Sequence, residues 1–226
     1  LDSRSLPRHP FYPDAPPQSS RIPMVIGNTR DETRAFLGND EANFTLTWDQ
    51  LPQKLREQQY VDLSPEVVIA EYRRLYPDYS PSEVFFAATT AGRSWRGAII
   101  EAEERARQGS PAWVYQLDWR SPADGGRLRA FHTLDIALVF DNVAAEGSKT
   151  GDDTRARAMA SRMSDALIAF SRHGDPNHRG IPAWSPYTLP RRQTMVFDDA
   201  SGMQDDPRGG ERSLYERVPF VQRGTM

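Results

Sequence analysis

Two short apolar segments constrain the fold most, because each has the length of a strand and is bounded by turn-forming residues. Residues 22–27 (Ile-Pro-Met-Val-Ile-Gly) end at a glycine, and residues 112–119 are rich in aromatic side chains. A long stretch with helical signals separates them. Continuous apolar runs of this length are typical of strands buried in a parallel sheet, whose neighbours need a crossover connection. The two segments therefore predict an α/β sheet with helical cover.

Helix signals fill the segments around these strands. Residues 64–66 (Ser-Pro-Glu) supply an N-cap serine, a proline at the first helical position and an acid in the first turn. Residues 80–83 repeat this start with a complete capping box between Ser80 and Glu83. The predicted helices are residues 47–55, one from Ser64 that ends before Pro77, one that starts at Ser80, residues 93–108 and residues 154–173, and residues 194–197 are a further short strand.

Composition excludes several classes of function. Apolar residues make up 38% of the chain, charged residues 26%, and the mean hydropathy is −0.67. No apolar run approaches the roughly 20 residues of a membrane-spanning helix. The net charge is −3, without a basic stripe for nucleic acid. The absence of cysteine excludes disulfides, thiolate metal sites and a cysteine nucleophile, and four histidines make no metal cluster. The sequence predicts a soluble protein with no membrane or nucleic-acid partner, and leaves cytoplasmic and secreted locations open.

The first residues carry no signal for regular structure. Residues 2–23 contain six prolines, no apolar period and no signal peptide. A domain rarely opens with so long a pattern-free segment, and two or three strands do not form a stable covered sheet alone. We therefore expect residues 1–226 to be the C-terminal portion of a single larger domain, whose remaining strands come earlier in the chain. A complete domain with an extended leader is the alternative.

Acidic and histidine side chains follow the two predicted strands. Asp31 and Glu32 come shortly after residue 27, and His132 comes after residue 119. Functional groups of an open α/β sheet gather beyond the carboxyl ends of strands. An acid followed by a histidine is the later part of the Ser–acid–His order of an α/β-hydrolase triad. The plain alternative is that Glu32 caps a turn and His132 is an ordinary loop histidine.

The residues of three segments make this pattern more specific. Residues 25–32 lead from a strand through a glycine to an Asp-Glu pair, residues 130–140 contain Ala-Phe-His and Asp-Ile, and residues 167–187 contain Gly-Asp-Pro-Asn. In order and separation they resemble the type B carboxylesterase and cholinesterase family. The resemblance implies the C-terminal part of an α/β-hydrolase fold, a mostly parallel sheet covered by helices with its N-terminal part missing. It puts the family's triad acid on Glu32 and its histidine on His132.

The chain departs from the family pattern in several places. Thr33 stands after the acid and Thr133 after the histidine, where the family often has glycine, and Ala137 replaces a common proline. A β-branched residue at position 33 would be strained if the backbone there needs a positive φ. No Gly-x-Ser-x-Gly occurs, since residues 147–151 (Gly-Ser-Lys-Thr-Gly) hold serine at the wrong position. The resemblance puts the serine nucleophile and the oxyanion loop before Leu1.

The resemblance implies a serine carboxylesterase that hydrolyses small-molecule carboxylic esters through an acyl-enzyme intermediate. His132 would act as general base and then general acid while Glu32 orients it, without a metal or organic cofactor. The chain as given lacks the nucleophile, so we expect it to be inactive alone and to need the upstream portion of the same enzyme. A catalytically inactive cholinesterase-like binding module and an unrelated complete α/β domain are the alternatives.

This assignment has a geometric consequence. A carboxylate oxygen of Glu32 is expected at hydrogen-bond distance from a ring nitrogen of His132, and Asp31 is expected to face away from that ring. Aromatic side chains at residues 85–86 and at Trp95 lie on predicted helices between the two site segments. They form either the wall of a substrate pocket or the core beneath the helices.

Overall fold

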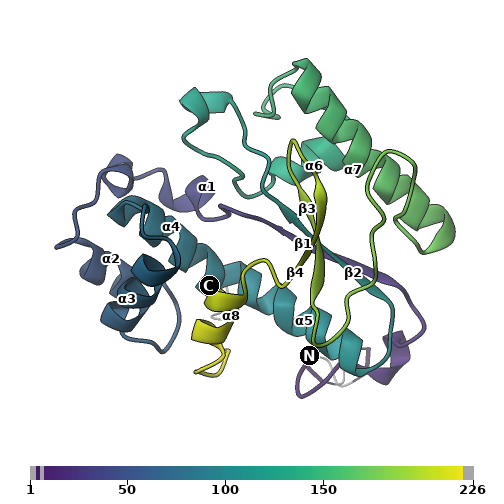
Figure 1. Ribbon diagram of the computed structural model, residues 1–226, viewed down its shortest axis with the longest axis horizontal. Helices are drawn as coiled ribbons and strands as arrows, with labels where there is room; N and C mark the ends of the chain where they lie inside the picture. The colour runs from purple at the N-terminus through teal and green to yellow at the C-terminus, as the bar shows by residue number, and fades with distance from the viewer. Residues whose placement is uncertain (1–3, 6–7, 221–226) are drawn as a thin grey trace.

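The computed structural model describes residues 4–5 and 8–220 and contains a four-stranded sheet (Figure 1). The strands, in spatial order, are β1 (Met24–Thr29), β2 (Ala112–Leu117), β3 (Gln193–Phe197) and β4 (Gly202–Asp205). The first three are parallel, and β4 runs antiparallel to β3 at one edge of the sheet. The three predicted strands are confirmed, with small shifts at their ends. The mostly parallel sheet with helical cover confirms the predicted fold class.

Different helices cover the two faces of the sheet, because neighbouring residues of a strand point in opposite directions. Trp113 and Leu117 of β2 pack beneath the long helix α7 (Thr154–His173), whereas Val114 packs against α5 (Arg96–Arg107). Figure 1 shows α7 and α5 on opposite sides of the strands.

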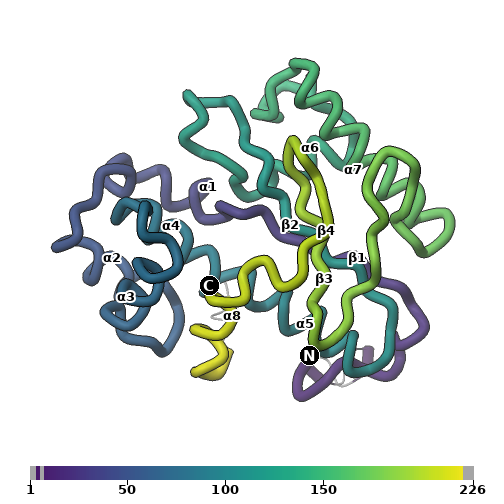
Figure 2. The backbone as a smooth tube through the Cα atoms, in the orientation of Figure 1, coloured from purple at the N-terminus to yellow at the C-terminus, as the bar shows by residue number. Residues whose placement is uncertain are grey.

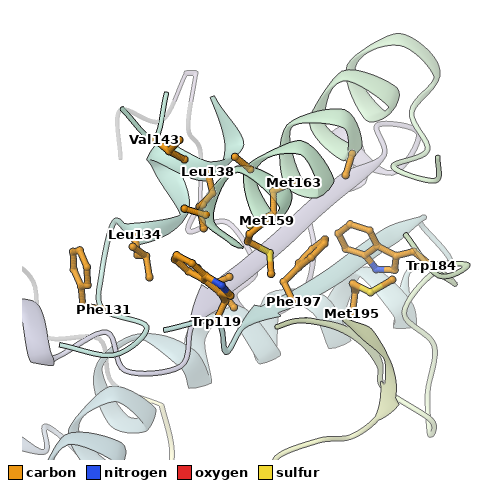
Figure 3. Close-up of a cluster of buried hydrophobic side chains, with 14 of the residues drawn as sticks. Trp119, Phe131, Leu134, Leu138, Val143, Met159, Met163, Trp184, Met195 and Phe197 are labelled. Atoms are coloured by element: carbon orange, nitrogen blue, oxygen red, sulfur yellow. The ribbon is translucent and has the colours of Figure 1, made fainter. Parts of the chain in front are cut away.

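The larger core lies between the sheet and α7. This helix has the predicted bounds: the Asp153 side chain caps its first turn, and Gly174 ends it with a left-handed φ of 71°. The side chains labelled in Figure 3 are Trp119, Phe131, Leu134, Leu138, Val143, Met159, Met163, Trp184, Met195 and Phe197. Phe131 and Leu134 flank His132 in the sequence, so this core holds the histidine segment from both sides.

A second core joins a group of helices that lies apart from α7, drawn in blue in Figure 2 with α8 in yellow beside it. These helices are α2 (Leu51–Gln58), α3 (Pro65–Leu75), α4 (Pro81–Thr90) and α8 (Gly209–Tyr215). Ser64 caps α3, and the capping box of Ser80 and Glu83 begins α4, as predicted. The predicted start of α2 at residue 47 is wrong. A helix that starts at residue 47 would place Pro52 in its interior, where proline has no N–H to donate. A start at Leu51 leaves Pro52 in the first turn, where no such donor is needed.

Helix α4 runs without a break through a π-helical turn (Ala91–Trp95) into α5. The prediction of a separate helix from residue 93 is therefore corrected. Gly92 lies in the wide turn, where a Cβ would stand 2.3 Å from the carbonyl oxygen of Gln59. The close approach of that carbonyl explains why a glycine occupies this position.

The segment before β1 contains a short 3-10 turn (Pro17–Ser19), and Arg105 of α5 fastens it. The Arg105 side chain is buried and donates hydrogen bonds to the carbonyl oxygens of Ser19, at 2.8 Å, and Ile22. These contacts fix the segment that the sequence left without pattern. No helix within the described ranges has the length and apolar character needed to cross a membrane.

Candidate active site

The candidate site lies where β1 and β2 end, at the same edge of the sheet, because the two strands are parallel and paired along their length. Glu32 follows β1 closely, and His132 follows β2 after an excursion of the chain, residues 118–131. Where the excursion returns, the backbone N–H of Asp31 donates to the carbonyl of Ala130, with an N···O distance of 2.8 Å. The N–H of His132, two residues after Ala130, donates to the carbonyl of Glu32 at 3.4 Å.

The side chains of Glu32 and His132 meet. Nδ1 of His132 lies 2.5 Å from Oε2 of Glu32, and the other carboxylate oxygen, Oε1, accepts the backbone N–H of Thr29 at 2.9 Å. The Glu32 side chain is 8% exposed and that of His132 is 48% exposed. The buried carboxylate therefore fixes Nδ1–H as the donor in the neutral imidazole, and leaves Nε2 on the open side of the ring.

Asp31, the acid that precedes Glu32, pairs with an arginine and not with the imidazole. Its carboxylate lies 3.2 Å from Nε of Arg34, at the start of α1 (Arg34–Leu37). The Arg34 guanidinium in turn donates to the carbonyl oxygen of Arg127 at 2.7 Å. Asp31 therefore serves the local structure of the loop rather than the imidazole.

Thr33 adopts an ordinary helical conformation, with φ at −73°. The backbone at this position does not need a positive φ, so the β-branched residue is not strained here. Its buried hydroxyl lies 2.8 Å from that of Thr89 and 3.0 Å from that of Thr90, and donates to the carbonyl of Phe86 at 3.0 Å. This cluster of three threonine hydroxyls, on Thr33, Thr89 and Thr90, holds the loop that carries Asp31 and Glu32 (the acid loop) against the end of α4.

Thr133, directly after the histidine, is the strained threonine. Its φ is 73°, in the left-handed region that a β-branched residue rarely adopts. It precedes α6 (Leu134–Val139), and the Asp135 side chain in the first turn of that helix accepts the Tyr115 hydroxyl at 2.8 Å. Burial and the neighbouring negative charge of Asp135 raise the pKa of Tyr115 well above its ordinary value. Tyr115 of β2 is therefore a neutral donor that holds the start of α6.

Aromatic side chains take two different places around the site. The ring of Phe36, which is 46% exposed, packs against the His132 imidazole with centroids 4.9 Å apart. Phe85, Phe86 and Trp95, by contrast, are buried in the core of the helical group. Of the two interpretations of these three residues, core packing is the one the structure supports.

Two cavities adjoin the site segments. An apolar cavity of about 310 Å³ lies along β1 and α7 and is lined by Val25, Gly27, Tyr115 and Trp184, among others. A polar cavity of about 370 Å³ is lined mostly by arginine and aspartate side chains. Across the described part of the chain, no cluster of three or more histidine or acidic side chains is arranged to hold a metal ion.

Sequence reasoning missed three residues that surround the pair: Arg34, Phe36 and Tyr115. Each acts through a contact with a distant segment, so no local pattern marks it.

Comparison with protein families matches residues 1–213 to the carboxylesterase family. The chain belongs to this family, and its sheet and helices are those of an α/β-hydrolase. Among solved structures, the carboxylesterase EST55 of Geobacillus stearothermophilus superimposes with a TM-score of 0.74 at 30% identity, over 95% of this chain and 44% of that one.

Curated relatives agree with this assignment. The para-nitrobenzyl esterase of Bacillus subtilis is 26% identical over 94% of this chain and 41% of its own length. The phenmedipham hydrolase of Pseudarthrobacter oxydans is 27% identical over 88% of this chain and 40% of its own length. The chain therefore spans about two fifths of the length of these proteins.

Proposed function

We propose that this chain is the C-terminal portion of a serine carboxylesterase, in which Glu32 and His132 are the acid and the base of the triad. The observation that carries the proposal is the 2.5 Å contact between Nδ1 of His132 and Oε2 of Glu32. It joins a buried carboxylate to a half-exposed imidazole in the chain order of the fold. Membership of the carboxylesterase family supports the same class of reaction.

In this mechanism Nε2 of His132 takes the proton of a serine hydroxyl as its oxygen attacks the ester carbonyl carbon. The tetrahedral intermediate collapses, the bond to the alcohol oxygen breaks, and Nε2 gives the proton to that oxygen. Water then repeats both steps on the acyl-enzyme, which releases the carboxylic acid and restores the serine. Glu32 accepts the Nδ1–H bond throughout and stabilises the imidazolium.

The serine and the oxyanion donors belong, in this proposal, to polypeptide that precedes Leu1. The sequence holds no Gly-x-Ser-x-Gly, and the chain covers only 41% of the para-nitrobenzyl esterase. Within the described residues β1 is paired on its β2 side alone, and the apolar cavity along it offers a surface for further helix or strand. We therefore expect the 226-residue chain to be inactive by itself.

The proposed substrate is a small-molecule carboxylic ester. Phe36 supports this class, because its exposed ring gives an apolar wall beside the imidazole that suits an apolar acyl or alcohol group.

The decisive experiment restores the upstream portion. The coding sequence before Leu1 is translated, joined to the chain in its natural frame, and the product is assayed with a chromogenic butyrate ester and with a fluorophosphonate that labels activated serines. Hydrolysis and labelling are expected, with a loss of about 10³-fold or more in His132→Ala. Glu32→Gln should also lose most of the activity. His173→Ala, at the exposed end of α7, is the matched control and should hydrolyse like the parent.

Hydrolysis that survives His132→Ala would overturn the proposed base. An extended protein that neither hydrolyses esters nor reacts with the fluorophosphonate would be the inactive binding module.

A further inference from the structure

Arg34 bridges the two loops that carry the candidate pair. Its guanidinium contacts the Asp31 carboxylate through Nε at 3.2 Å, on the acid loop, and donates through Nη1 to the carbonyl oxygen of Arg127 at 2.7 Å, on the returning excursion. The side chain is only 5% exposed. A buried guanidinium that spans two segments fixes their separation, because its donors stand in a rigid planar fork.

Two groups offset part of the cost of burying the Arg34 charge. Asp31 supplies the opposite charge, and the ring of Phe86 on α4 lies beneath the guanidinium, with Cζ 4.5 Å from its centroid. The guanidinium is therefore confined between the core and the excursion rather than free to adopt other rotamers.

The returning excursion depends on such contacts for its position. It contains left-handed residues at Asp124, Gly125, Gly126 and Arg129, and the residue after His132 is left-handed as well. Non-glycine residues stay in this region only where surrounding contacts hold them. Arg34 supplies the contact at Arg127, five residues before the histidine.

We propose that Arg34 is a positioning residue: by holding the carbonyl of Arg127 it keeps Nδ1 of His132 on the Glu32 carboxylate. Asp31 acts through Arg34 by orienting its guanidinium. This inference rests on the proposed function, because the pair that Arg34 positions is the proposed acid and base. Arg34 itself touches neither side chain of the pair in the contacts described above.

The tautomer of His132 reports this positioning directly. A carboxylate on Nδ1 holds the neutral ring as the Nδ1–H tautomer, and a ring released from the carboxylate returns to the mixture of a solvent-exposed histidine. Long-range ¹H–¹⁵N correlations of the ¹⁵N-labelled 226-residue chain, recorded at alkaline pH, distinguish the two ring nitrogens without relying on exchangeable protons. The His132 signals are assigned by their disappearance in His132→Gln.

The same spectrum contains an internal reference. Nε2 of His178 lies 3.0 Å from the carbonyl oxygen of Arg162, and its Nδ1 accepts the N–H of Gly180 at 3.1 Å. His178 should therefore show the opposite, Nε2–H tautomer, and should do so in every variant.

Arg34→Met is the principal variant, because methionine keeps apolar contact with Phe86 while it removes both polar contacts. We expect His132 to change from predominantly Nδ1–H to the exposed-histidine mixture. Arg105→Met is the matched control. It also removes a buried arginine that donates hydrogen bonds to backbone carbonyls, but those carbonyls lie in the segment before β1. It should leave the His132 tautomer unchanged.

Asp31→Asn keeps the inference testable if Arg34→Met does not fold, as judged by circular dichroism. It leaves the packing intact and weakens only the hold on the guanidinium, so a partial shift toward the mixture is expected. A parent-like tautomer in the folded Arg34→Met chain, or in Asp31→Asn when that chain is the one that folds, overturns the inference.

Glu32→Ala separates this inference from the proposed function. If Glu32→Ala leaves the tautomer as in the parent, the carboxylate does not hold the imidazole, and the proposed pair itself fails. If Glu32→Ala releases the ring but Arg34→Met does not, the pair stands and only the role of Arg34 is wrong.

Discussion

Gly27 of β1 and Tyr115 of β2 are cross-strand partners, and the Tyr115 ring fills the space where a side chain on residue 27 would begin. A Cβ on residue 27 would stand 2.1 Å from the nearest ring carbon. The ring lies there while its hydroxyl bonds Asp135, so the absence of one side chain lets β2 reach the segment after His132.

Gly27→Ala should therefore destabilise the chain by about 3 kcal/mol, since it displaces the ring and breaks its bond to a carboxylate. Urea unfolding at neutral pH measures this change. Gly202→Ala is the control, because a Cβ there meets no atom within 4 Å and should change the free energy of unfolding by less than about 1 kcal/mol. Equal effects of the two substitutions would contradict the ring contact.

Thr133→Gly should stabilise the chain by about 0.5–1 kcal/mol. The left-handed φ of 73° costs threonine more than the added backbone entropy costs glycine in the unfolded state. Thermal unfolding measures the change. Thr45→Gly is the comparison, since that exposed threonine has φ at −130° and should lose stability on the same substitution.

The same substitution at Thr33 should have the opposite sign. Thr33→Gly removes a buried hydroxyl with contacts to Thr89, Thr90 and the Phe86 carbonyl, at a backbone φ that needs no glycine. We expect a loss of about 2–4 kcal/mol in urea unfolding. Thr33→Ser keeps the hydroxyl and should lose less than Thr33→Gly. A gain in stability for Thr33→Gly would show that the threonine cluster does not hold the acid loop.

Glu211 of α8 contributes to the dependence of stability on pH in acid. Burial opposes its ionisation, but the charge and hydrogen bonds of Arg208, the charge of Arg30 and the hydroxyl of Tyr72 lower the pKa of Glu211 to about 2. A lowered pKa means that the stabilisation is fully present above the ordinary value of 4.5 and is lost as the pH falls from there toward 2. The parent should lose about 3 kcal/mol across this interval from this group.

Glu211→Gln tests this role. It leaves the buried Arg208 charge without its partner, so a loss of about 3–5 kcal/mol at neutral pH is expected in urea unfolding. The variant should also lack that part of the acid-dependent loss. Glu66→Gln, whose side chain is 63% exposed, should change the free energy of unfolding by no more than about 0.5 kcal/mol.

The elements that the sequence predicted well are those whose signals are local. Helix α7 has its cap, its apolar face and its terminal glycine within its own residues, so both ends were predictable. Helix α8 was missed because its buried face carries Glu211, which looks like a surface residue until Arg208, Tyr72 and Tyr76 surround it. Strand β4 was missed because Gly-Met-Gln-Asp forms a strand only through its pairing with β3.

The candidate site shows the same limit. Glu32 and His132 could be proposed from the sequence because each follows a strand within a recognisable sequence pattern, and their side chains meet in the structure. Arg34 could not, since its partner Arg127 is far along the chain and its burial depends on Phe86. The left-handed φ at Thr133 was not predicted either, because φ there is set by the contacts of the excursion and not by residue type.

The continuous helix from α4 through the π-helical turn to α5 contacts the chain on both sides of β1. Thr89 and Thr90 hold the loop after the strand, and Arg105 holds the carbonyls of Ser19 and Ile22 just before it. The number of residues between Thr90 and Arg105 therefore sets the distance between the two contacts that hold β1. One residue inserted there would rotate Arg105 by about 100° relative to Thr90 and shift it by about 1.5 Å along the helix axis. Helix length and strand register must therefore change together.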